Sequence, residues 1–76
     1  MTERQKLLLA TYPDFVAKNL ISMRTIRKNL GWRLNATAKN AGFTPQHYSL
    51  IELLRVLPKK DTYNKIARFF DWEIWE

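Results

Sequence analysis

The sequence contains no cysteine, only two glycines and no long apolar run. Without cysteine no disulfide can crosslink the chain, so a hydrophobic core must stabilise its fold. The aliphatic run LLLA at residues 7–10 is far shorter than the roughly 18 residues that a membrane span needs. No segment resembles a signal peptide. We therefore expect a soluble, cytoplasmic protein with no membrane partner.

Acidic residues are missing from the middle of the chain. Residues 15–51 contain no Asp or Glu, but they include the basic residues Lys18, Arg24, Arg27, Lys28, Arg33 and Lys39. Elsewhere the basic and acidic residues balance, so the formal net charge of +6 arises in this window. A one-sided basic field attracts polyanions, which favours a nucleic acid as the partner. A solvated basic face without a partner is the alternative.

Side chains that commonly carry catalysis are scarce as well. The chain has no cysteine nucleophile and no glycine-rich phosphate loop, and its single histidine is His47. No carboxylate lies at a spacing from His47 that is typical of a catalytic dyad or a metal site. We predict an exposed His47, no enzymatic activity, no cofactor or metal, and no small-molecule substrate.

The apolar pattern predicts an all-α fold in one domain that covers residues 1–76. Apolar residues recur every three or four positions, as in the expected buried stripe Val16, Leu20, Met23, Ile26 and Leu30. No segment alternates for long with the period of a strand. The expected helices cover about residues 3–10, 14–30, 34–41, 45–55 and 62–70. Asp14 is the expected cap of the second helix.

A tight turn between the third and fourth helices is the clearest local signal. Gly42 suits the left-handed position that ends a helix. Thr44 can cap the next helix through its hydroxyl, and Pro45 suits its first position, where no amide hydrogen is needed. The pattern predicts a helix, a turn and a second helix over about residues 34–55, preceded by an N-terminal helical extension over residues 1–22.

The C-terminal part combines an apolar helix face with an aromatic, acidic end. We expect Ile66, Ala67 and Phe70 to be buried by the last helix. The ending DWEIWE is expected to fold back on the helices through Trp72, Ile74 and Trp75. A partner-binding surface is the alternative role for these aromatic residues.

The residues from 31 to 72 resemble the lambda-repressor-like (Cro/CI-type) helix-turn-helix domain. The features that carry this resemblance are Gly31, Ala38, the turn AGFT, then Tyr48, Ser49, Ile51 and Glu52, Pro58 and the segment KIARFF. A narrower similarity to Ner-type phage regulators rests on Leu34, GFTP, LRVLPKK and the ending EIW. Both imply a compact bundle of about five helices that binds double-stranded DNA and regulates transcription, often in a phage or another mobile element of a bacterial host.

The resemblance also implies which residues contact DNA, because the second motif helix of the family lies in the major groove. Thr44 and Lys39 would face phosphates, as would Arg33 and the pair Lys59 and Lys60. The residues that would face base edges are Gln46, His47, Ser49 and Leu50. Gln46 is the best candidate reader, since its amide can both donate to and accept from adenine.

Three leucines depart from the family pattern and leave a second function open. Leu34, Leu50 and Leu53 occupy positions that are usually polar in Cro/CI-type proteins. Either they are buried in a rearranged core, or the surface binds another protein, as in a phage antirepressor that inactivates a partner repressor. The expected contacts in that case are Leu50, Leu53, Leu54 and Trp72. A homodimer, or a subunit role in a larger complex, also stays open.

Overall fold

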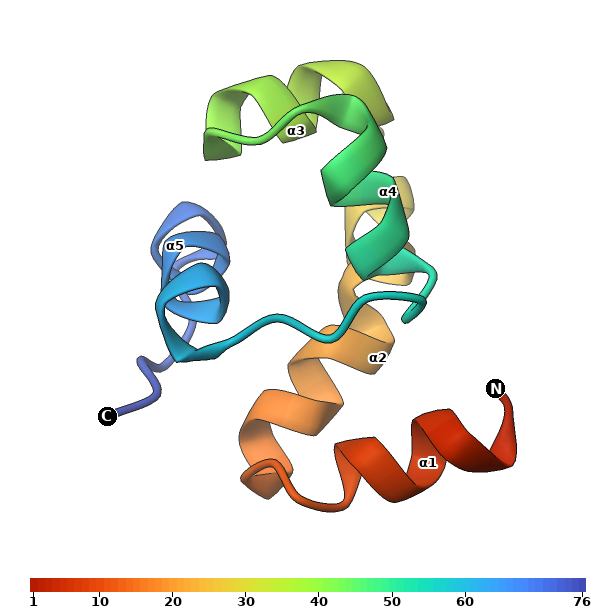
Figure 1. Cartoon of the computed structure of the whole chain (residues 1–76). Helices are drawn as coiled ribbons and strands as arrows, with labels where there is room; N and C mark the ends of the chain where they lie inside the picture. Colours follow the sequence, from red (N-terminus) through yellow and green to blue (C-terminus); the bar gives the residue numbers. More distant parts are fainter.

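Five helices follow one another in the computed structural model, which describes all residues 1–76 (Figure 1). They are α1 (Glu3–Leu9), α2 (Asp14–Asn29), α3 (Leu34–Ala41), α4 (Pro45–Glu52) and α5 (Lys60–Phe70). The chain forms no strand, so the all-α prediction is confirmed. No helix is long and apolar enough to cross a membrane.

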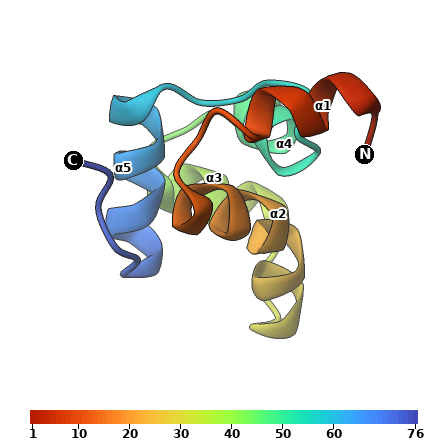
Figure 2. The same ribbon diagram turned by 90° about the horizontal axis from the view of Figure 1, so that it is seen from below.

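All five helices contribute side chains to a single core. Its buried members are Leu9, Val16, Leu20, Met23, Ala38, Tyr48, Ile51, Tyr63, Ile66 and Ala67. Figure 1 shows the C-terminal part of α2 behind α4, with α3 above, α5 on the left and α1 crossing the lower end of the bundle, and in Figure 2, seen from below, α1 lies in front of α4. The two termini lie on opposite sides of the molecule in both views. One core shared by all helices explains how so short a chain folds without disulfides.

The buried stripe of α2 differs from the predicted one at its C-terminal end. Val16, Leu20 and Met23 are buried, but Ile26 is only partly buried, and Leu30 is about half exposed and lies beyond the last helical residue. Arg27 takes the buried position instead, four residues after Met23, which keeps the helical spacing. The prediction failed because an arginine with a buried partner can replace an apolar residue.

The prediction that Asp14 caps α2 is wrong. Pro13 occupies the cap position, and no side chain accepts a hydrogen bond there. Asp14 is the first helical residue, where its carboxylate lies near the positive end of the helix dipole. By contrast, α1 has a complete capping box, in which Thr2 and Gln5 exchange hydrogen bonds between side chain and backbone.

Helix α4 ends at Glu52, three residues before the predicted end at Arg55. Leu54 adopts a left-handed backbone conformation with φ of 60°, and a right-handed helix cannot continue through such a residue. The backbone amide of Arg55 then bonds to the carbonyl oxygen of Leu50 at 2.9 Å. Leucine favours helices, so no local pattern in the sequence predicts this stop.

The C-terminal segment folds back on the bundle, as predicted. Trp72, Ile74 and Trp75 are partly buried against the core. The Asn64 amide on α5 fixes this segment, because it donates to the carbonyl oxygen of Trp75 at 2.8 Å and accepts from the Trp75 amide at 2.7 Å. Phe70 is only partly buried, which corrects the prediction for that residue; its ring stacks on Trp72 at 4.6 Å.

Candidate nucleic-acid interface

The turn between α3 and α4 has the geometry that its residues favour. Gly42 is left-handed with φ of 89°, and the Phe43 amide bonds to the carbonyl oxygen of Ala38 at 2.8 Å. The Thr44 hydroxyl accepts from the His47 amide at 3.2 Å, and Pro45 is the first residue of α4. These contacts set α4 at a fixed angle to α3 and confirm the predicted turn.

Helix α5 holds the same turn from the other side through Lys65. The Lys65 ammonium donates to the carbonyl oxygen of Gly42 at 2.7 Å and lies 4.7 Å from the centre of the Phe43 ring. A Cβ atom at position 42 would come within 2.6 Å of the Lys65 side chain. The left-handed backbone favours glycine here, and any larger residue would also displace the end of the Lys65 side chain. No local pattern in the sequence predicts this contact.

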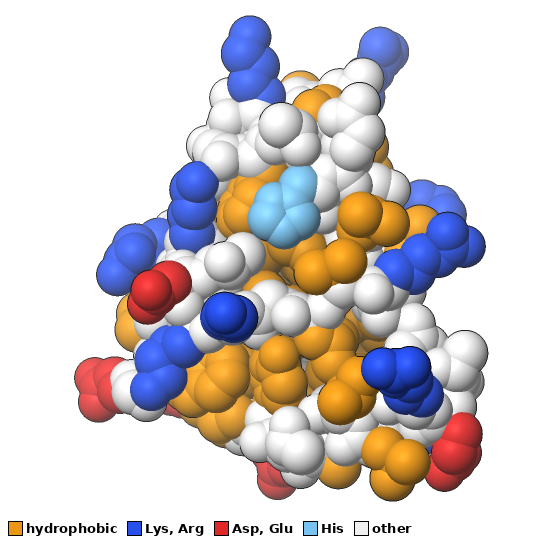
Figure 3. Space-filling model, in the orientation of Figure 1, with side chains coloured by type: hydrophobic (Ala, Val, Ile, Leu, Met, Phe, Trp, Pro, Cys, Tyr) orange, Lys and Arg blue, Asp and Glu red, His pale blue; other side chains and the backbone are white.

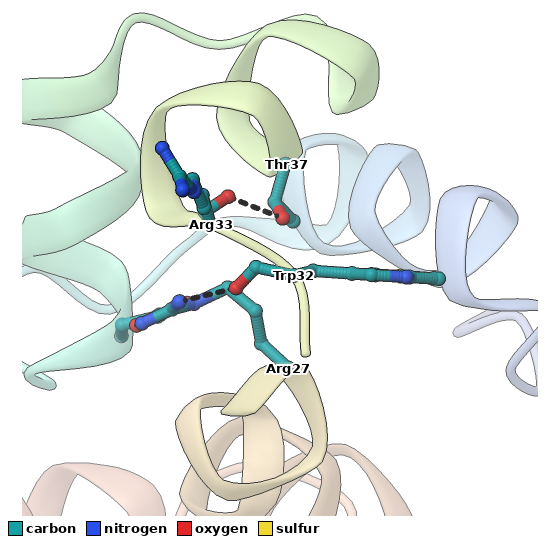
Figure 4. A network of polar contacts seen from close by, with 5 residues as sticks. Arg27, Trp32, Arg33 and Thr37 are labelled. Atoms are coloured by element: carbon teal, nitrogen blue, oxygen red, sulfur yellow. Dashed lines mark hydrogen bonds and ion pairs between the residues drawn. The ribbon is translucent and has the colours of Figure 1, made fainter. Parts of the chain in front are cut away.

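A buried ion pair anchors the other end of α4, and Figure 4 shows the Arg27 side chain that forms it. Arg27 donates from Nε to Glu52 Oε2 at 2.7 Å and from Nη2 to Glu52 Oε1 at 3.1 Å. Its Nη1 also donates to the carbonyl oxygen of Trp32 at 2.8 Å, in the link between α2 and α3. The Glu52 contact raises the pKa of Arg27. Arg27 was expected to add to the basic field, but Glu52 neutralises it.

Tyr48 lies beside this pair and is fully buried. Its hydroxyl has no hydrogen-bond partner, although the Glu52 carboxylate is near enough to act on it electrostatically. Burial, and then the negative charge of Glu52, raise the pKa of Tyr48. The inner face of α4 is therefore fixed by packing and by charge, which leaves its outer face free for contacts.

The outer face of α4 forms one exposed stripe that changes character along the helix. Gln46 and His47 are exposed in the first turn, and Leu50 and Leu53 follow with 38% and 41% of their surfaces exposed. Ser49 is partly buried. Positions three, four and seven residues apart lie on the same side of a helix, so the exposed stripe (Gln46, His47, Leu50 and Leu53) is continuous.

Four of the predicted phosphate contacts are exposed cations without an ionic partner. Arg33, Lys39, Lys59 and Lys60 are all exposed, and the single ion pair of the chain joins Arg27 to Glu52. The Arg33 side chain points away from Arg27 (Figure 4), while its carbonyl oxygen accepts from the Thr37 hydroxyl at 2.7 Å. Lys60 also lies 5.6 Å from the ring of Trp75.

The face that carries α3 and α4 has an uneven distribution of charge and apolar surface (Figure 3). Basic side chains surround His47, the single histidine, and no acidic side chain appears in the upper part, where α3 lies. Apolar side chains fill much of the lower part. Asp61 is the acidic residue that lines the shallow pocket shared by Thr44, His47 and Lys65.

The leucines that depart from the family pattern separate into two groups. Of the three, only Leu34 is partly buried against the core, so repacking accounts for it; Leu54, an expected contact of the antirepressor, is partly buried too. Trp72 packs against the core in the same way. Leu50 and Leu53 are exposed, so burial does not explain their apolar character.

The fold and the capped turn define a helix-turn-helix protein. A profile of this family, described as Helix-turn-helix, matches residues 23–73, which is more than half of the chain. No curated protein and no solved structure matches the chain. The chain belongs to the lambda-repressor-like helix-turn-helix family, whose members bind double-stranded DNA and regulate transcription.

Sequence reasoning missed two residues that position the interface, Arg27 and Lys65. A signal for Arg27 was present: it falls on the buried stripe of α2, and a buried arginine needs an acidic partner. Glu52 is the first acidic residue after Asp14, so the pair could have been proposed. Lys65 had no such signal, because its contact depends on how α5 packs against the turn.

Proposed function

We propose that the chain is a transcriptional regulator of phage or mobile-element type that places α4 in the major groove. The observation that carries this proposal is the polar first turn of α4, where Gln46 and His47 are exposed above a turn fixed by Thr44 and Lys65. An α-helix fits the major groove, and its N-terminal residues reach the base edges in this class of protein.

Each predicted contact has a separate task in this proposal. Gln46 reads a base edge through its amide, and His47 and Ser49 add further polar contacts in the groove. Leu50 contributes only an apolar contact, such as one with a thymine methyl group. Thr44 and the exposed cations Arg33, Lys39, Lys59 and Lys60 bind phosphates and set the orientation of the protein.

A salt titration tests the role of the cations. If the four exposed cations neutralise phosphates, log affinity for duplex DNA should fall against log salt with a slope of roughly −4. Lys39→Ala should reduce the steepness by about 1 on every duplex sequence. The matched control is Arg68→Ala, which also removes an exposed cation. Arg68 lies in the last turn of α5, whereas Lys59 and Lys60 lie at its N-terminal end. A flat salt response would contradict DNA binding by this surface.

An antirepressor is the second candidate function, and the exposure of Leu50 and Leu53 favours it. In this case the C-terminal half of the exposed stripe contacts a partner repressor, and desolvated leucines act as its central anchors. Leu54 and Trp72 contribute less, because both already pack against the core. Titration of the neighbouring repressor protein with Leu50→Ala and Leu53→Ala tests this function: loss of repressor binding supports it, and unchanged binding excludes it.

A further inference from the structure

A groove runs between α1 and the segment that links α4 to α5, away from the first turn of α4. It has a volume of about 540 Å³, and its lining residues are Arg4, Gln5, Leu8, Tyr12, Leu54, Arg55 and Leu57. We call this the apolar groove. The family profile begins at residue 23, so α1, which forms one wall, lies outside the part that the family shares.

Hydrogen bonds join the two walls of the groove and fix their position relative to each other. The Gln5 amide donates to the carbonyl oxygen of Leu54 at 2.7 Å, and the Tyr12 hydroxyl donates to that of Pro58 at 2.8 Å. Leu54 keeps a left-handed backbone that is unfavourable for leucine. The two hydrogen bonds and the strained backbone of Leu54 give the groove a defined shape, and a groove whose shape is fixed in advance loses less entropy when it binds a ligand.

The surface around the groove is apolar as well. Leu8 in its wall is 46% exposed, and the neighbouring Leu53 and Val56 are also exposed. Figure 3 shows apolar side chains over the linking segment and α1, with basic side chains on either side and acidic side chains further out at the edges. Small proteins seldom leave several neighbouring apolar side chains exposed without a partner.

The charges at the groove indicate what kind of partner fits. Arg4 and Arg55 are exposed, neither forms an ion pair, and no acidic residue lines the groove. A second copy docked by two-fold symmetry would bring the same arginines towards each other, which disfavours a symmetric dimer at this site. The acidic end of another copy is not free either, since Asn64 clamps Trp75 to its own core.

We infer that the apolar groove binds an amphipathic helix of another protein, with apolar residues facing Leu8, Leu54 and Leu57 and acidic residues beside Arg4 and Arg55. Helices that dock into grooves present apolar residues at positions i, i+3 or i+4, and i+7. The acidic flank supplies charge complementarity and excludes basic helices. The regulator would thereby join a partner protein through a surface separate from Gln46 and His47, whether or not these bind DNA.

The probe for this inference is a displayed library of helical 18-residue peptides with randomised surface positions. Selection on the whole chain should enrich peptides with apolar residues at helical spacing and Asp or Glu on the flanks. A synthetic peptide of the enriched sequence should bind at least about tenfold more weakly to Arg4→Glu/Arg55→Glu. Leu8→Glu should weaken binding by a similar factor or more.

Two control variants match these changes outside the groove. Ile21→Glu introduces an acid at an exposed apolar position of α2, and Lys18→Glu/Arg24→Glu reverses two exposed charges on the same helix. Both should bind the peptide as the parent does. Circular dichroism of every variant confirms that each one is folded, and duplex DNA binding is measured in parallel.

Five results would overturn the inference. The first three are no enrichment on the parent over the Arg4→Glu/Arg55→Glu variant, enrichment of peptides without acidic residues, and equal loss of peptide binding in the control variants. The fourth is a parent dimer that Leu8→Glu converts to a monomer, which would show that a second copy covers the groove. Loss of DNA binding alone in the arginine variant, with peptide binding intact, would also contradict it.

Discussion

The two halves of the exposed stripe on α4 differ more than their short separation suggests. The first turn presents Gln46 and His47 beside exposed cations, whereas the end of the helix presents Leu50 and Leu53 beside further apolar side chains. Gln46, His47 and Leu50 lie on one helix of eight residues, and Leu53 is the cap residue directly after it. This difference separates the two proposed functions, because the polar half is suited to DNA and the apolar half to a protein partner.

The inner side of α4 explains why the outer side is free to vary. Tyr48, Ile51 and Glu52 are all buried, and the helix is fixed at both ends, by Lys65 at the turn and by Arg27 at Glu52. None of these contacts uses a residue of the exposed stripe. Substitutions on the stripe should therefore change binding with little effect on stability, usually within about 0.5 kcal/mol.

The largest effect is expected from removal of the buried ion pair, because unfolding of the domain would abolish binding by both halves of the stripe. Arg27→Ala leaves the Glu52 carboxylate buried without a counter-ion and should cost about 3–5 kcal/mol of unfolding free energy. A domain of this size has little more than that in total, roughly 5 kcal/mol at the low end. Denaturant titration should show a largely unfolded variant.

A double variant provides the control for that loss. Arg27→Met/Glu52→Leu replaces both charges by apolar side chains of similar size and should regain most of the lost stability. If Arg27→Ala unfolds at the same denaturant concentration as the parent, the pair does not anchor α4 and the proposed rigidity of the helix is wrong.

A smaller effect is expected from a change that disturbs only the polar half. Gly42→Ala forces a Cβ onto a left-handed residue and against Lys65, at a cost of about 1–2 kcal/mol. Gly31→Ala is the matched control, because Gly31 has φ of 73° and its Cβ would meet no atom within 4 Å. Thermal melts should place Gly42→Ala below Gly31→Ala, and equal melting temperatures would show that the Lys65 contact contributes nothing.

The smallest expected effect concerns Tyr48. Its buried hydroxyl has no partner, so Tyr48→Phe should leave stability unchanged or raise it by about 1 kcal/mol. A raised pKa means that the folded state keeps the phenol proton where the unfolded chain, with a value near 10.0, releases it. Stability should therefore fall as pH rises above about 10, and less steeply in Tyr48→Phe. Identical alkaline unfolding of parent and variant would contradict the assigned burial.

The sequence predicted features that depend on neighbouring residues. Helix α3 and the turn followed from Gly42, Thr44 and Pro45, since each acts within a few positions of itself. The end of α4 did not, because the Gln5 amide that holds Leu54 comes from 49 positions earlier in the chain. The pairing of Arg27 with Glu52 spans 25 positions and was missed as well, although the place of Arg27 on the buried stripe of α2 was a signal for an acidic partner. The exposure of Leu50 and Leu53 could be decided only once the core was known.

The central claim is that the polar half of the exposed stripe reads DNA, and paired titrations of Gln46→Ala and Leu50→Ala test it most directly. The ligands are a preferred duplex selected from a random library and a scrambled duplex. Gln46→Ala should lose about 1–3 kcal/mol on the preferred duplex and relax the preference at one base pair, while Leu50→Ala should lose less. If Gln46→Ala binds both duplexes as the parent does, and Leu50→Ala and Leu53→Ala abolish binding of a partner repressor, then the stripe binds protein and the claim is wrong.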